Sequence, residues 1–148
     1  MINQKLSISE IVAKLEGTTL GMDDGRRYIQ GNIEVYYKGE WGTICEDQFN
    51  RNNNGAIVVC RMMGYSSGDY SSSYRQATVT PSTRIWLDNV QCVGTVTHID
   101  RCQHDNWGSH TCTHNQDVAI RCYGNLPLYI ATGSSLFRHF HSLLKRWY

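Results

Sequence analysis

The sequence predicts an α+β domain with one hydrophobic core and three disulfides. Apolar and polar residues alternate, as in strands, near residues 32–37 and again near residues 118–122. A single helical pattern lies between them at residues 56–63. Six cysteines, an even number, fall between residues 45 and 122, in a chain of 148 residues. Because this length suits a single domain, elements of both kinds are expected to share one core.

The cysteines predict a covalent framework. No two of them are separated by the two-residue gap that is typical of zinc ribbons and redox dithiols. We therefore expect three disulfides and an oxidising, extracellular compartment. The spacing alone leaves the pairing open. The six residues are Cys45, Cys60, Cys92, Cys102, Cys112 and Cys122.

The N-terminal residues fit two patterns. Residues 13–16 alternate between apolar and charged side chains, as a strand does, whereas apolar residues at 8, 11, 12 and 15 behind Ser7-x-x-Glu10 fit a short capped helix. We favour a strand from about Ile11 onward. A hairpin follows, because residues 32–37 alternate and Lys38-Gly39 offers a tight turn into residues 41–45.

One helix is predicted after the asparagine cluster at 52–54, which supplies an N-cap. Apolar residues at 56, 59, 60 and 63 then share one helical face, and Gly64 provides the C-terminal stop. Because Cys60 belongs to this face, it should point into the core.

The remaining segments are a loop, two strands and a tail. Residues 65–83 are rich in Ser, Gly and Tyr and contain Pro81, which predicts a long exposed loop. Short strands are expected at 85–87 and 118–122. Beyond Cys122, apolar and basic residues alternate with a helical period up to residue 147. Such a tail could bind a membrane surface or a partner, or it could fray or pack on its own domain.

Five stretches resemble the hallmarks of the scavenger receptor cysteine-rich domain. The similarity extends over residues 12–123, which leaves 1–11 as an N-terminal extension and 124–148 as a basic amphipathic C-terminal tail. The six-cysteine count resembles group A of the family. The stretches are GNIEVYYKGEWGTIC (31–45), VVCRMMGY (58–65), IWLDNVQC (85–92), NWGSHTC (106–112) and DVAIRC (117–122).

The resemblance implies a fold and a disulfide pairing. The expected fold is a curved antiparallel sheet that cradles one helix, which agrees with the hairpin, helix and closing strand predicted above. The implied bridges are Cys45–Cys112, Cys60–Cys122 and Cys92–Cys102.

The function implied by the resemblance is that of an extracellular, non-catalytic module that binds protein or polyanionic ligands through its loops. The alternative is a non-catalytic accessory domain of a larger secreted or membrane-bound enzyme of the serine protease or lysyl oxidase type. Paired cysteines would leave no thiolate nucleophile, and we identify no catalytic constellation in the sequence.

Charge and hydropathy limit the partners. The chain has 14 Lys and Arg against 13 Asp and Glu, so its net charge of +1 gives no general attraction to nucleic acid or membranes. We expect no specific nucleic-acid recognition, and membrane contact only through a parent protein. No apolar run reaches the roughly 20 residues of a membrane span, and the N-terminus lacks a signal-peptide core. Because the cysteines predict an oxidising compartment, we expect a piece of a longer secreted or membrane-anchored protein, or a chain whose true start was missed. Candidate residues for an anionic ligand are Arg26, Arg27, Arg75, Arg84 and Arg101, with Lys38 and Arg51 as further basic loop residues.

The resemblance also implies calcium sites built from loop carboxylates. Calcium prefers several oxygen ligands, and disulfides would hold such a cluster together. The amides of Asn50 and Gln116 stand where the family has acidic residues, which should weaken binding. Alternatively, Asp47 and Asp88 accept backbone hydrogen bonds. One set would be Asp47, Asn50 and Gln116, and the other Glu46, Asp88 and Thr111.

A zinc cluster is the rival interpretation of the histidines. Imidazole and thiolate groups are good zinc ligands. If the implied disulfides form, however, the two cysteines are lost as ligands, and we do not favour zinc. The residues concerned are Cys102, His104, His110, Cys112 and His114.

Overall fold

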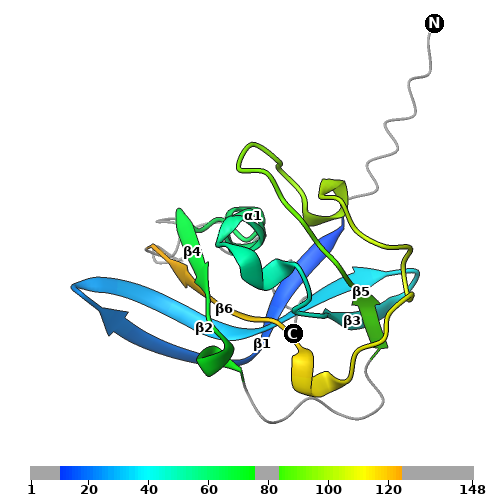
Figure 1. The fold of residues 1–148 in the computed structure, drawn as a ribbon. Coiled ribbons are helices and arrows are strands. Elements are labelled where there is room, and N and C mark those ends of the chain that lie inside the picture. The colour runs from blue at the N-terminus through cyan, green and yellow to red at the C-terminus, as the bar shows by residue number, and fades with distance from the viewer. Residues whose placement is uncertain (1–10, 76–83, 125–148) are drawn as a thin grey trace, which may run out of the picture.

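A curled sheet wraps around one α-helix in the computed structural model, as Figure 1 shows. The structure describes residues 11–75 and 84–124. The strands are β1 (Val12–Asp23), β2 (Arg26–Tyr37), β3 (Glu40–Ile44), β4 (Ser67–Tyr70), β5 (Arg84–Leu87) and β6 (Ala119–Tyr123), and the α-helix is α1 (Asn54–Met62). Short 3-10 helices are η1 (Phe49–Arg51), η2 (Ser72–Tyr74), η3 (Ile99–Arg101) and η4 (His114–Gln116). The predicted α+β class and the sheet that cradles a helix are confirmed.

Strand β2 organises the sheet. It pairs with β1 along one side, and on the other side it pairs with β6 through residues 28–32 and with β3 through residues 34–37. Strand β1 confirms the predicted N-terminal strand. Strand β2 begins at Arg26, earlier than the alternation at Asn32 predicted, because pairing with β1 holds the polar segment 26–30 extended. Asp24 and Gly25, with φ of 47° and 75°, form the turn between β1 and β2.

The sheet is mixed rather than wholly antiparallel, because β5 runs parallel to β3. The chain leaves β3, passes through α1 and β4, and returns to the same end of the sheet, and such a long crossover is what a parallel pair requires. The predicted β2–β3 hairpin, with Lys38 and Gly39 at φ of 46° and 83°, is confirmed. The residues that follow β3 and β5 therefore leave the sheet at the same end, where both strands finish.

Helix α1 packs its predicted face against the sheet. Ala56, Val59 and Cys60 are fully buried, and Gly64 ends the helix with φ of 89°. The asparagine cluster acts differently from a simple N-cap. Asn52 accepts a hydrogen bond from the Asn54 N–H through its side-chain oxygen (2.9 Å). The neighbouring asparagine, at position 53, instead accepts from the backbone of β4 (3.0 Å).

The prediction of a loop throughout residues 65–83 was wrong for Ser67–Tyr70, which forms β4 on the edge of β6. Gly68 explains this, because a Cβ atom built there would lie 2.4 Å from Cys60 Sγ. A glycine in the middle of the segment therefore lets β4 lie close against the helix. Residues 76–83, including Pro81, lie outside the described residues.

The core lies between α1 and the sheet. Ile33, Val35, Ile44, Val59 and Ile120 are fully buried there. None of the helices in residues 11–75 and 84–124 has the length and apolar character needed to cross a bilayer. The alternative of a capped helix through residues 8–15 is wrong where the structure describes it, because residues 12–15 belong to β1. Its first residues and the basic tail from residue 125 lie outside the described residues, and the domain limits at 12 and 123 stay predictions.

Three disulfides connect these elements, in the pairing that the family resemblance implies. One ties the helix to the closing strand, one ties the end of β3 to the loop before η4, and one closes a short loop. They are Cys60–Cys122, Cys45–Cys112 and Cys92–Cys102, with sequence separations of 62, 67 and 10 residues. No cysteine in the described residues is free.

Candidate functional site

Two carboxylates meet just beyond β3 and β5. Cys45 N–H donates to the Leu87 carbonyl (2.8 Å), so the parallel strands bring Asp47 and Asp88 to the same end of the sheet. The side-chain oxygens of both aspartates and the sulfurs of Cys45 and Cys112 all lie within 4.8 Å of one another. The two sulfurs are joined in a disulfide and cannot act as thiolate ligands. The carboxylates remain as the oxygen donors of this group.

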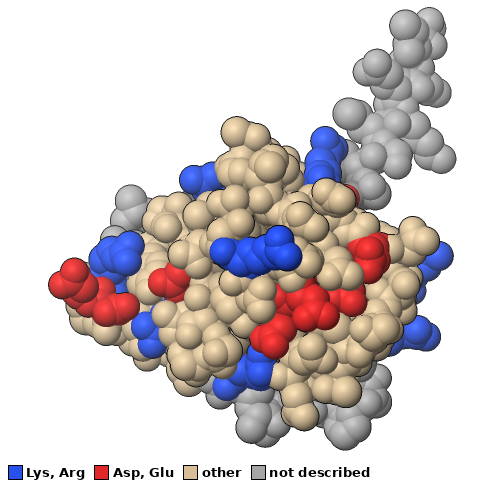
Figure 2. Space-filling view, in the orientation of Figure 1, with Lys and Arg blue, Asp and Glu red and all other residues tan. Residues whose placement is uncertain are grey.

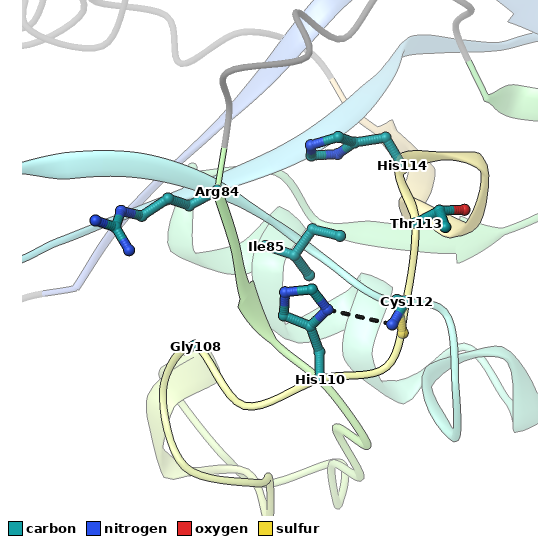
Figure 3. A pocket seen from close by; sticks show the side chains of 7 residues that line it. All are labelled: Arg84, Ile85, Gly108, His110, Cys112, Thr113 and His114. Atoms are coloured by element: carbon teal, nitrogen blue, oxygen red, sulfur yellow. Dashed lines mark hydrogen bonds between the residues drawn. The ribbon is translucent and has the colours of Figure 1, made fainter.

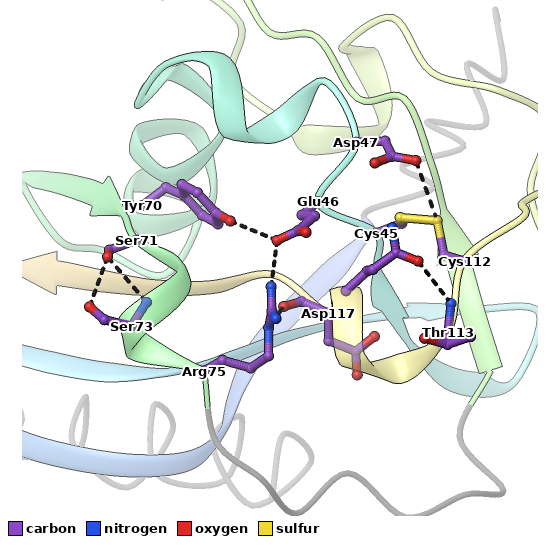
Figure 4. A network of polar contacts seen from close by, with 11 residues as sticks. Cys45, Glu46, Asp47, Tyr70, Ser71, Ser73, Arg75, Cys112, Thr113 and Asp117 are labelled. Carbon is purple, nitrogen blue, oxygen red and sulfur yellow. Dashed lines mark hydrogen bonds and ion pairs between the residues drawn. A yellow bond between two sulfur atoms is a disulfide. The ribbon is translucent and has the colours of Figure 1, made fainter.

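The two aspartates have different surroundings. Asp88 is buried, and its Oδ1 accepts a hydrogen bond from the Asn89 N–H (2.8 Å). This is the backbone role that the sequence offered as the alternative. Asp47 is half-buried, and its Oδ2 lies 3.8 Å from Cys112 Sγ, as Figure 4 shows. A disulfide sulfur carries no proton, so this is a contact and not a hydrogen bond.

Glu46 belongs to a different network. Its carboxylate accepts a hydrogen bond from the Tyr70 hydroxyl (2.9 Å) and forms an ion pair with Arg75. Figure 4 shows it directed toward these two side chains, whereas Asp47 is directed toward the disulfide. Burial, followed by the hydrogen bond to Glu46, raises the pKa of Tyr70 to about 12. The predicted ligand Glu46 is therefore already neutralised by a cation of the same chain.

The other predicted calcium ligands are an amide that already has a partner and two exposed side chains. Gln116 Oε1 accepts from the Thr113 N–H (3.2 Å) in a capping box at η4. Asn50 and Thr111 are exposed. The structure thus brings together Asp47 and Asp88, which the sequence had assigned to different sets. The reason is the parallel pairing of β3 and β5, which the expectation of an antiparallel sheet did not contain.

A buried carboxylate that the sequence did not single out lies beside this network. Asp117 is fully buried, accepts from the Thr43 hydroxyl (2.7 Å), and pairs with His114 Nδ1 (2.9 Å). Its backbone carbonyl accepts from Arg75 Nε (2.9 Å). Burial raises the pKa of Asp117, although the two side-chain hydrogen bonds oppose this shift. The only signal in the sequence was an aspartate directly before the predicted strand 118–122. Nothing in the sequence indicated that its side chain would be buried.

Three of the five candidate arginines have partners within the domain. Arg75 pairs with Glu46, as described above. Arg84 forms an ion pair with Glu40. The guanidinium of Arg26 lies 4.2 Å from the ring centroid of Tyr123.

The five arginines do not form one patch. Arg26 and Arg27 begin β2, whereas Arg84 begins β5 beside Gly42, opposite Val35 of β2. A strand advances about 3.3 Å per residue, so about 30 Å of strand separates the two ends. Arg27 and Arg101 are exposed. On the face seen in Figure 2, acidic side chains gather right of centre and again at the left end of the view, and basic side chains form several separate groups.

A shallow pocket of about 370 Å³ lies along β5, as Figure 3 shows. His110 Nδ1 accepts from the Cys112 N–H (3.2 Å), which leaves the proton of the neutral ring on Nε2. The rival zinc cluster has lost its thiolates, because Cys102 and Cys112 are in disulfides. The pocket is lined by Arg84, Ile85, Gly108, His110, Cys112, Thr113 and His114.

The sequence model of the family described as the scavenger receptor cysteine-rich domain matches residues 23–123. Among curated proteins, the macrophage receptor MARCO of Mus musculus is 48% identical over 93 residues, which are 63% of this chain and 17% of the receptor. Lysyl oxidase homolog 3B of Danio rerio is 42% identical over 100 residues, which are 66% of this chain and 12% of that protein. This chain therefore matches less than a fifth of the length of either relative.

A solved structure shares the fold. It is the crystal structure of the dimeric form of the SRCR domain of mouse MARCO, which is 46% identical in sequence. The superposition has a TM-score of 0.56 and covers 64% of this chain and 87% of the mouse domain. The curled sheet, the helix and the disulfide framework are thus features that this chain shares with a known receptor domain.

Proposed function

The chain belongs to the scavenger receptor cysteine-rich domain family, and on this premise we propose that it is an extracellular binding module that recognises protein or polyanionic ligands and catalyses no reaction. The similarity to a macrophage receptor supports a receptor-type role. Three disulfides suit an oxidising compartment, in keeping with a secreted protein or the ectodomain of a membrane protein.

The separation of the basic residues supports a polymeric anion as one ligand class. Arg26 and Arg27 lie about 30 Å from Arg84 along β2. A small anion reaches only one end, whereas a long polyanion can contact both ends at once and gain affinity from the second contact without any new group. This separation is the observation that carries the proposal.

Binding of the full oxidised chain to dextran sulfate tests the proposal, with neutral dextran as the control for the sugar backbone. Long chains should bind more tightly than fragments that cannot span 30 Å, and added salt should weaken binding. Equal affinity for neutral and sulfated dextran would contradict it.

Charge reversal tests the residues. Arg27→Glu and Arg101→Glu change exposed arginines of the candidate set, and Arg61→Glu changes an exposed arginine on α1 outside it. The first two should lower the affinity several-fold more than the third. Equal losses would indicate a response to net charge rather than to these sites.

We further propose that a calcium ion assists this function at Asp47 and Asp88. Two carboxylates from different loops, one of them buried, offer hard oxygen ligands at one place. Exposed Asn50 and Thr111 are candidates for neutral oxygen ligands, and solvent would complete the shell. Glu46 and Gln116 are less suited, because both already have partners within the domain.

The similarity to a lysyl oxidase homolog favours a second candidate role, that of a non-catalytic accessory domain in a larger enzyme. The two roles share the binding chemistry and differ in the rest of the parent protein. Sequencing the full-length transcript distinguishes them, since a catalytic domain in the same reading frame would establish the accessory role.

We also propose that the domain self-associates, because the mouse domain that it resembles has been crystallised in a dimeric form. Pairing would present the separated basic groups of two copies to one polymeric ligand and so raise its avidity.

A further inference from the structure

The end of the β1–β2 hairpin carries exposed apolar side chains. Leu20 and Met22 are 82% and 66% exposed, and both lie on β1, two residues apart and therefore on one face. Strand β6 pairs with β2 only from residue 28 onward, so the hairpin end extends past it, as Figure 1 shows. We call residues 19–29 of this hairpin the arm.

The two faces of the arm differ. On one face, Gly21 lies against Tyr28, whose ring also contacts Tyr123 and the guanidinium of Arg121. On the other face, Leu20 lies opposite Ile29 of β2. The first face is therefore already packed by the domain. On the second face Ile29 packs against the core, whereas Leu20 and Met22 present apolar surface to solvent.

The outer edge of β1 is also unprotected. Within the described residues β1 pairs only with β2, so the backbone groups on its far side are not part of the sheet. Residues 17–22, Gly-Thr-Thr-Leu-Gly-Met, contain no charge and no proline, which are the features that usually block edge pairing. The register shift between Glu16 and Thr19 limits the regular edge to the arm.

We propose that the arm is the surface through which two copies of this chain pair, edge to edge and antiparallel, in the self-association proposed above. A two-fold interface must be complementary to itself. Alignment of Leu20 opposite Met22 of the second copy places Gly21 opposite Gly21, and it joins the four exposed apolar side chains on one face of a continuous sheet. The identity of the partner rests on the proposed function, whereas the surface rests on the arm itself.

Charge selects this register over its neighbour. Alignment of Leu20 opposite Leu20 would bring Glu16 of one copy toward Asp24 of the other, and like charges across a strand pair are unfavourable. The chosen register instead places Thr19 opposite Asp23, so a hydroxyl faces a carboxylate. The paired surface is small compared with that of stable dimers, so the dimer should be weak and dependent on concentration.

Sedimentation velocity of the full oxidised chain, from about 10 µM to about 1 mM, tests the proposal. The variant Leu20→Asp/Met22→Asp should weaken dimerisation by at least about tenfold. The matched control is Val93→Asp, because Val93 is 64% exposed and lies outside the arm. Melting curves should show that all three proteins are equally folded, since the substituted side chains are exposed.

Each outcome is decisive. A wild-type dimer that is lost in the arm variant and kept in the control supports the proposal. A dimer that survives in the arm variant overturns the arm and leaves self-association standing, whereas a wild-type chain that stays monomeric throughout overturns both. Hydrogen exchange adds an independent readout, because amides 19–23 should become more protected as concentration rises, and unchanged protection would exclude edge pairing.

Discussion

Asp47 and Asp88 are far apart in the sequence, yet their carboxylates lie within 4.8 Å of each other because they follow two parallel strands that end at the same edge. The disulfide of Cys45 and Cys112 fixes this edge against the loop before η4. Two like charges held this close repel each other, and a cation between them removes this repulsion. This repulsion is the physical reason to expect that calcium stabilises the fold.

Calcium should therefore raise the melting temperature of the wild-type domain. A ligand that binds only the folded state at 100 times its dissociation constant adds about 2.7 kcal/mol to the free energy of unfolding. Asp47→Asn and Asp88→Asn should each remove most of this gain, whereas Asp24→Asn, in the exposed β1–β2 turn, should keep it. Differential scanning calorimetry with calcium and with a chelator measures the effect. Identical melting in both conditions would refute the cation proposal.

The disulfides should differ in their contributions to stability. Cys60–Cys122 closes a separation of 62 residues and Cys92–Cys102 one of 10. In the chain-entropy description, their removal costs about 4 and about 3 kcal/mol. The loss at Cys60 should be larger still, because Gly68 of β4 packs against its sulfur.

Denaturant unfolding of the two double variants, Cys60→Ala/Cys122→Ala and Cys92→Ala/Cys102→Ala, measures this difference. Each variant serves as the control for the other, since both replace one bridge by two alanines. Equal losses, or a larger loss at the short loop, would contradict the expected order.

Two tyrosines should resist ionisation in the folded domain. Burial raises the pKa of Tyr70 to about 12, with Glu46 as the next cause, and burial together with Asp69 raises the pKa of Tyr123 to about 12. Because the folded-state pKa lies above the unfolded value of 10.0, the stability that these groups contribute is complete below about pH 10 and is lost as the pH rises toward 12.

A rapid pH jump followed by tyrosinate absorbance measures this resistance before the disulfides react with base. Compared with the wild type, Tyr70→Phe and Tyr123→Phe should each lose tyrosinate absorbance only in the most alkaline part of the titration. Tyr36→Phe is a suitable control, because Tyr36 is 42% exposed. An absorbance loss near pH 10 in the first two variants would show that burial does not govern their ionisation.

The fold was predictable wherever it depends on local patterns. Short-range sequence patterns predict three features: the turn at Lys38-Gly39, the helix before Gly64 and the buried face around Cys60. Strand β4 was not predictable in this way. Its residues favour a loop by composition, and they are extended because they pair with β6.

The candidate site was predictable only in part, for the same reason. Both Asp47 and Asp88 were identified, but their meeting depends on the direction of β5, which no local pattern reveals. Arg75 was expected to contact an anionic ligand, and its partner Glu46 was expected to bind a cation. Their ion pair depends on tertiary packing, which brings the residue after η2 beside the loop that follows β3, so the sequence could not show that the two residues neutralise each other.

Asp117 should make the stability of the domain vary with pH in the acidic range. Burial raises its pKa above the usual 3.8, so the folded protein holds this proton more tightly than the unfolded chain does. The stabilising contribution of Asp117 is therefore complete below pH 3.8 and declines as the pH rises through the folded-state pKa.

The variant Asp117→Asn tests this dependence, because it lacks this titration and keeps a side-chain oxygen that can accept from the Thr43 hydroxyl. Relative to the wild type, its melting temperature should rise as the pH increases through this range. Glu34, whose pKa is also raised by burial, is present in both proteins and cancels in the difference. A difference between the two melting temperatures that stays constant with pH would show that Asp117 does not carry the raised pKa.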